Sequence, residues 1–193
     1  FEHSDRLSRD FLWSNASFCF PWGYIIYRTV YTADSDELWP LATAKLSSFM
    51  DYEIKQDLRR DPERYSDNPR PEQLVQESHR DVVVSDKRCW DGAGIEPIRR
   101  HFANYLHKTK LGAYGGCGRS EACMVTDERS LKSIIACPKP DSKDRFTRQD
   151  GFVGMVDGRY NPEGKDSPRY LGLMRVGIGF LCFLKEVPSE IAL

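Results

Sequence analysis

The residues best suited to moving a proton lie in two short stretches of the chain. His79 and Asp81 flank Arg80 immediately before an apolar run. If this stretch is extended, His79 and Asp81 share a face, and the carboxylate can orient the imidazole for general acid–base catalysis. Tyr27, within an earlier apolar run, is a third candidate catalytic residue. A polar strand entrance with a surface ion pair is the alternative interpretation of His79 and Asp81.

A charged residue also stands inside the apolar stretch Trp22–Thr32, WGYIIYRTVYT. This stretch reads as a strand with two mostly apolar faces, which predicts a central strand covered on both sides. Arg28 is therefore expected in or beside a core, where a guanidinium needs a carboxylate or several carbonyls. Arg28 either forms a core salt bridge or lines, with Trp22, a pocket for a polar or anionic ligand.

Carboxylates close two of the predicted strands, where loops gather and sites are often built. Asp127 follows ACMVT, and Asp157 ends GFVGMVD. If either carboxylate reaches Arg28 or Arg175, the pair is a core salt bridge or the floor of a ligand pocket. Ordinary turn residues are the alternative interpretation of both aspartates.

The segment 112–120, GAYGGCGRS, is rich in glycine. Clustered backbone N–H groups can cradle an anion, with Arg119 as a ligand. A phosphate-binding loop, however, follows a strand and carries a lysine, whereas here a helix leads in and the lysine is absent. A plain connection is therefore favoured. Cys117 lies between glycines and beside Arg119, where a reactive thiolate would be stabilised.

The six cysteines do not form the close pairs typical of zinc sites, and no nucleotide-binding fingerprint is present. We therefore expect no metal and no cofactor. Cys137, like Cys19 and Cys182, has apolar neighbours and is expected to be buried as a small hydrophobic residue. A chain of this length does not need disulfides, which favours a reduced, cytoplasmic compartment.

The composition is that of a soluble globular protein: 193 residues, 40% hydrophobic and 30% charged, with a formal net charge of -1. Because basic and acidic residues are nearly equal in number, the chain has no overall positive field that would attract nucleic acid. No apolar run is long enough to span a membrane. We expect a small polar or anionic molecule as partner rather than nucleic acid or a membrane.

The pattern of elements predicts an α+β fold. A strand is followed by a helix with Leu38, Ala42, Leu46, Phe49 and Ile54 at helical spacing and Pro40 in or just after its first turn. DVVVSD then predicts a strand, residues 95–106 a second helix, and ACMVTD, SIIAC, GFVGMVD and LMRVGI further short strands. We expect one domain, residues 22–193, with a mixed or antiparallel sheet and helices mainly on one face. Residues 1–21 form an aromatic-rich N-terminal extension.

Four stretches, WGYIIYRTVYT, DGAGIEPIRRHF, CMVTDERSL and LGLMRV, resemble a large group of uncharacterised ascomycete fungal proteins. The resemblance covers roughly residues 20 to 186. It implies a fungal, intracellular origin and a place among the accessory enzymes of specialised metabolism. It implies no catalytic residue.

The leading functional hypothesis is a small, metal-independent enzyme or ligand-binding protein acting on a polar organic molecule. The alternative is a protein-interaction module in which exposed aromatic residues dock a partner or a second copy of the chain, giving a homodimer. The residues proposed for that surface are Phe11, Trp13, Phe18 and Phe20.

Overall fold

The computed structural model describes residues 23–60, 71–109, 122–140, 151–158, 160, 172–179 and 181. Trp22, Cys117, Arg119 and the aromatic residues of the N-terminal extension lie outside the described residues, and so do the predictions made for them. The described part confirms a single α+β unit built on a mixed sheet.

Five strands form this sheet in the order β2-β1-β3-β4-β5. Their bounds are β1 Ile25–Arg28, β2 Val82–Val84, β3 Ala122–Thr126, β4 Phe152–Asp157 and β5 Leu173–Gly177. β1 runs parallel to both β2 and β3, whereas β3, β4 and β5 are successively antiparallel. The three parallel strands therefore all end at the same edge of the sheet.

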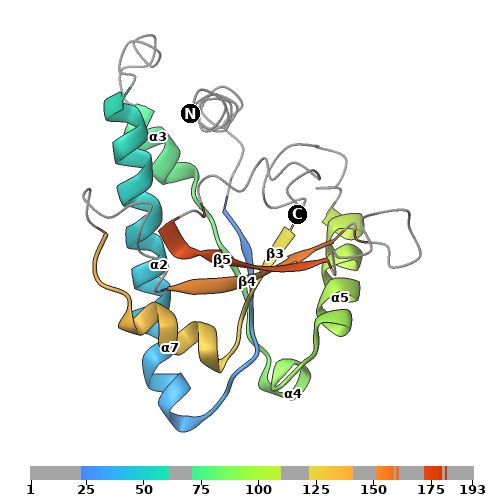
Figure 1. Cartoon of the computed structure of the whole chain (residues 1–193). Coiled ribbons are helices and arrows are strands. Elements are labelled where there is room, and N and C mark those ends of the chain that lie inside the picture. Colours follow the sequence, from blue (N-terminus) through green and yellow to red (C-terminus); the bar gives the residue numbers. More distant parts are fainter. Residues whose placement is uncertain are drawn as a thin grey trace.

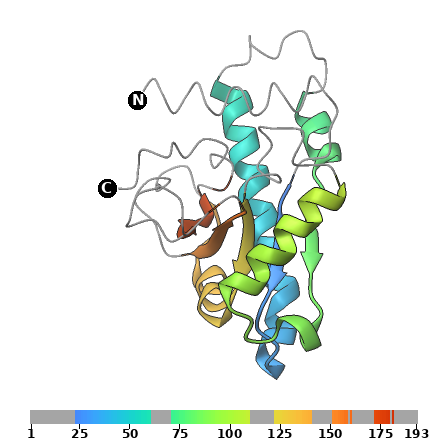
Figure 2. The same cartoon turned by 90° about the vertical axis from the view of Figure 1, so that its right-hand side faces the viewer.

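Helices cover both faces of the sheet, not mainly one. They are α2 (Ala33–Arg60), α3 (Pro71–Ser78), α4 (Lys87–Trp90), α5 (Ile95–Thr109) and α7 (Glu128–Ala136). The chain moves outward from β1 to β2 and then back past β1 to β3, and right-handed crossovers in opposite directions place their helices on opposite faces. Figures 1 and 2 show α2 on one side of the sheet and α5 on the other.

Two apolar clusters hold these layers together. Ile26 and Met124 face α2 and α7, whereas Tyr27 and Cys123 face α4 and α5. The side chains of β1 thus alternate between two buried layers, as its sequence predicts. The strand itself is shorter than the predicted Trp22–Thr32 because the chain leaves the sheet after Arg28.

The helix predicted after β1 is confirmed, and its apolar residues at helical spacing are buried, with Leu38 partly so. Thr32 caps it, since its Oγ1 accepts a hydrogen bond from the Ser35 N–H at 3.2 Å. The helix begins at Ala33, so Pro40 lies well inside it and not in its first turn. No described helix is both long and apolar enough to cross a membrane.

One predicted strand, SIIAC, is wrong: Ser133 to Ala136 belong to α7, and Cys137 is the residue that caps its carboxyl end. Asp127 caps this helix by accepting a hydrogen bond from the Ser130 N–H, and Leu131 and Ile134 are buried on one side of it. A spacing of three residues fits a helix as well as the β-branched isoleucines fit a strand, and the cap decides between them.

Candidate functional site

The amino edge of the sheet, residues 23–24 and 79–82, carries the predicted acid–base pair. His79 Nε2 lies 3.1 Å from Asp81 Oδ1, so the predicted contact between imidazole and carboxylate is present. The same oxygen accepts a hydrogen bond from the Tyr24 N–H at 2.8 Å. Both residues precede β2 and do not share a face within it. Asp81 thus joins the start of β1 to the entrance of β2.

Close backbone approach at the amino edge requires a glycine. Gly23 has a φ of 130°, and a Cβ there would lie 2.7 Å from the Arg80 carbonyl oxygen. Only glycine adopts this conformation without strain and leaves room for the neighbouring strand. At the amino edge, the backbone of Gly23 therefore packs closely against the backbone of Arg80 and the side chain of Asp81.

Tyr27 points away from the amino edge and toward α5. Its hydroxyl lies 2.7 Å from His101 Nδ1, and its ring and that of Trp90 both meet the imidazole edge to face. Burial is the main cause that raises the pKa of Tyr27 above its ordinary value, so the phenol stays protonated at neutral pH. Burial likewise raises the pKa of the neighbouring Cys123 thiol to about 12. Tyr27 therefore acts as a neutral hydrogen-bonding group that anchors the exposed His101.

The opposite edge is where β1, β2 and β3 all finish. We call it the carboxyl edge and include the segments that follow these strands, residues 28–36, 85–94 and 126–130. The segments after β1 and β3 lead to α2 and α7 on one face, whereas the segment after β2 leads to α4 and α5 on the other. Ligands of open α/β sheets bind outside the carboxyl ends of parallel strands, where connections separate in this way.

Arg28 is the last residue of β1 and, as predicted, is buried, with 8% of its surface exposed. Its Nη2 donates to the Asp36 carboxylate and to Ser35 Oγ, and its Nε donates to the Val30 carbonyl. The carboxylate that pairs with Arg28 thus comes from the first turn of α2 and not from Asp127 or Asp157. A partner on the following helix is possible because the chain turns back directly after the strand.

Two aromatic rings fix the guanidinium of Arg28. Its Cζ lies 4.5 Å from the centroid of the Tyr31 ring and 5.2 Å from that of Trp39. Contacts of this kind add attraction between the cation and the rings. Arg28 is thus held in one orientation by rings as well as by hydrogen bonds.

Two hydroxyls at the carboxyl edge are buried without a hydrogen-bond partner among the described residues, Thr126 Oγ1 and the Tyr31 hydroxyl. Thr126 ends β3, is fully buried, and lies opposite Arg28 in the register of β1 and β3. By contrast, the hydroxyl of the adjacent Thr29 donates to the Thr126 carbonyl at 3.3 Å. Since buried polar groups are nearly always paired, these two hydroxyls distinguish the carboxyl edge as a candidate binding site.

The segment after β2 is tied to the same edge. Lys87 Nζ donates to the Tyr31 carbonyl at 3.3 Å, and the Gly92 N–H donates to the Thr29 carbonyl at 3.0 Å. Asp86 caps α4 by accepting from the Arg88 N–H, which lowers the pKa of its carboxyl. Burial raises the pKa of Tyr31, although the Arg28 charge opposes it. Tyr31 therefore stays neutral at the meeting point of three segments.

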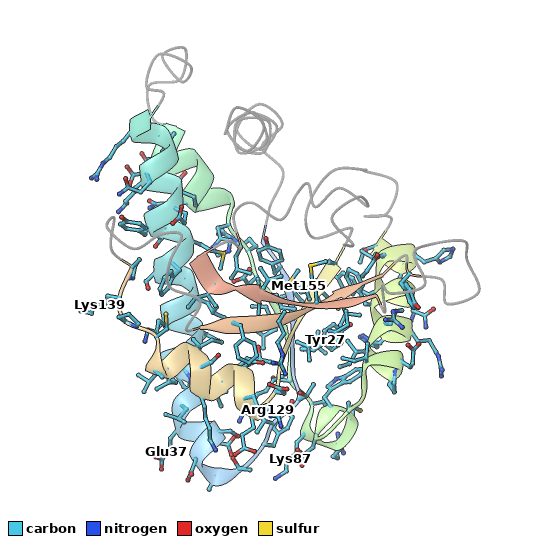
Figure 3. The ribbon with its side chains drawn as sticks, viewed as in Figure 1. Tyr27, Glu37, Lys87, Arg129, Lys139 and Met155 are labelled. Carbon is cyan, nitrogen blue, oxygen red and sulfur yellow. The ribbon has the colours of Figure 1, made fainter. Side chains whose placement is uncertain are left out.

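Charges at the start of α7 are largely paired among themselves. Asp127 Oδ1 accepts from the N–H and the hydroxyl of Ser130 at 2.7 and 2.6 Å. Lys132 donates to Glu128, and this bond raises the pKa of the lysine. Figure 3 shows Glu37, Lys87 and Arg129 near this end of the molecule, with Tyr27 further up toward α5.

The structure thus separates the candidate residues that it describes. His79 and Asp81 lie at the amino edge, Tyr27 under α5, and Arg28 and Asp127 at the carboxyl edge. Arg175 lies exposed on β5 and packs over the Phe152 ring at 4.9 Å. Among the described residues, no group of three or more His, Cys, Asp or Glu side chains is placed to hold a metal ion.

Two residues of the carboxyl edge escaped sequence analysis, Thr126 and Tyr31. Thr126 directly precedes the candidate residue Asp127, and Tyr31 lies three positions after the candidate residue Arg28. The available signal was their position at the end of an apolar run. Searches of family models, curated proteins and solved structures find no match to this chain.

Proposed function

We propose that the protein binds a small polar organic molecule at the carboxyl edge, without a metal ion. The observation that carries this proposal is the hydroxyl of Thr126, which is fully buried, has no partner among the described residues and lies opposite Arg28. Burying an unpaired hydroxyl costs on the order of 1–3 kcal/mol. Such a cost at the edge where sheets of this kind bind ligands supports a role in binding.

The proposal assigns binding and no reaction. His79 and Asp81 lie at the other end of the sheet, and Tyr27 hydrogen-bonds with His101 on the other face. These acid–base candidates therefore do not meet Arg28 in one site. Two further parts of the proposal have separate support. The buried thiol of Cys123, which forms no disulfide, supports a reduced cytoplasmic setting, and sequence resemblance alone supports fungal specialised metabolism.

A ligand screen by NMR tests the proposal. Amide spectra of the whole chain would be recorded with a library of sugars, amino acids, carboxylic acids, amides and nucleosides. We expect at least one class to shift amides of residues 28–36 and 126–130 saturably, while those of residues 79–82 stay in place. Thr126→Val should weaken that binding by about tenfold or more, equivalent to about 1.4 kcal/mol. Tyr27→Phe, on the other face, should leave it unchanged.

Two results would overturn the proposal. One is saturable binding that maps to residues 79–82 or to α5 and leaves the carboxyl edge unshifted. The other is binding at the carboxyl edge that Thr126→Val leaves as tight as in the unmodified chain.

A further inference from the structure

The free hydrogen-bond donors of the carboxyl edge indicate what kind of group a ligand presents there. Arg28 uses Nε and Nη2 for protein acceptors, whereas its Nη1 forms no hydrogen bond with any described residue. The rings of Tyr31 and Trp39 fix the guanidinium, and so they also fix the direction in which Nη1 donates. A guanidinium N–H that donates to a carboxylate forms a charge-assisted hydrogen bond, which is stronger than a neutral one.

Further donors lie at the same edge of the sheet. The register of β1 and β3 places Thr126 directly opposite Arg28 and on the same face of the sheet. α7 begins two residues later, and Asp127 caps only the N–H of Ser130. The first N–H groups of a helix have no acceptor within the helix, and its N-terminus favours negative charge. Guanidinium, buried hydroxyl and helix start together form a set of donors for an anionic group.

The carboxylates of the same edge limit the charge of that group. The charge of Arg28 is already balanced by Asp36, and that of Lys132 by Glu128. Asp127 and Arg129 stand in the same turn and carry opposite charges, so together they add no net charge to the start of α7. A group with two negative charges would therefore meet no excess of positive charge here, whereas one with a single charge gains the donors at a smaller electrostatic cost.

We propose, resting on the function proposed above, that the ligand is a small monocarboxylic acid. Its carboxylate accepts hydrogen bonds from Arg28 Nη1, from the Thr126 hydroxyl and from the first-turn N–H groups of α7. Because Thr126 is fully buried, binding requires a local rearrangement that opens a path to its hydroxyl. Binding then gives the Thr126 hydroxyl the partner that it lacks among the described residues.

A titration with three small probes tests this assignment. Acetate, acetamide and inorganic phosphate have similar sizes but carry one, no and up to two negative charges. At constant ionic strength, we expect acetate to shift the amides of residues 126–130 saturably. Acetamide and phosphate should require at least about tenfold higher concentration for the same shift. Thr126→Val should weaken acetate binding by about tenfold or more, and Tyr27→Phe should leave it unchanged.

The outcomes separate this inference from the proposed function. Phosphate or acetamide binding as tightly as acetate would overturn the monocarboxylate and leave ligand binding at this edge intact. The same conclusion follows if the library yields a ligand at this edge while acetate shifts nothing there. If acetate binds equally well to Thr126→Val and to Arg28→Met, both the monocarboxylate contact and the site itself are wrong.

Discussion

The two edges of the sheet differ in whether their buried polar groups have hydrogen-bond partners. At the amino edge, Asp81 joins the imidazole of His79 to the backbone of Tyr24, and Gly23 lets the strands approach closely. At the carboxyl edge, Arg28 is well held, but the hydroxyls of Thr126 and Tyr31 are buried without partners in the described part of the chain. Paired polar groups stabilise a fold, whereas unpaired buried ones weaken it. This contrast supports a stabilising role for the amino edge and agrees with the binding role proposed for the carboxyl edge.

The largest effect is expected at the amino edge, from Asp81→Ala. This change removes the acceptor of the Tyr24 N–H and one partner of His79, and it should cost about 2 kcal/mol in the free energy of unfolding, measured in urea. Asp81→Asn, which keeps an acceptor oxygen, should cost clearly less. If Asp81→Ala stays within about 0.5 kcal/mol of the unmodified chain, the amino edge contributes no special stability and the comparison fails.

A smaller effect distinguishes two buried tyrosines. Tyr27→Phe removes the hydrogen bond to His101 and should cost about 1 kcal/mol in the free energy of unfolding. Tyr31→Phe removes a hydroxyl that has no partner among the described residues and should cost nothing. Urea unfolding of both variants at one pH near neutrality provides the measurement. Equal losses in the two variants would show that the Tyr31 hydroxyl does have a partner in solution.

Local sequence pattern was sufficient for much of the fold. Alternation in β1 predicted its two buried faces, and helical spacing predicted α2 and α5. The sequence pattern gave the wrong element where two features competed. In SIIAC the β-branched isoleucines favoured a strand, whereas the cap at Asp127 favours the helix that the structure shows. The sequence pattern also missed the helices on both faces, because these follow from strand order, which only long-range pairing determines.

Fewer features of the candidate site than of the fold could be predicted from the sequence. An arginine in an apolar strand requires a partner for its charge, and so Arg28 could be selected from the sequence as a candidate site residue. Its partner Asp36 could not, since several carboxylates follow predicted strands and only the turn after β1 brings this one back. In the sequence Thr126 is an ordinary strand residue, and only the structure shows that it lies opposite Arg28 with a hydroxyl that no described residue pairs.

The most direct test compares two threonines that meet at the carboxyl edge. The hydroxyl of Thr29 donates to the Thr126 carbonyl, whereas that of Thr126 has no partner among the described residues, so valine should affect the two sites with opposite sign. In urea unfolding, we predict that Thr29→Val loses about 1 kcal/mol and that Thr126→Val gains about 1 kcal/mol. A loss of stability in Thr126→Val as large as that in Thr29→Val would contradict an unpaired hydroxyl at this edge, and with it the proposed binding site.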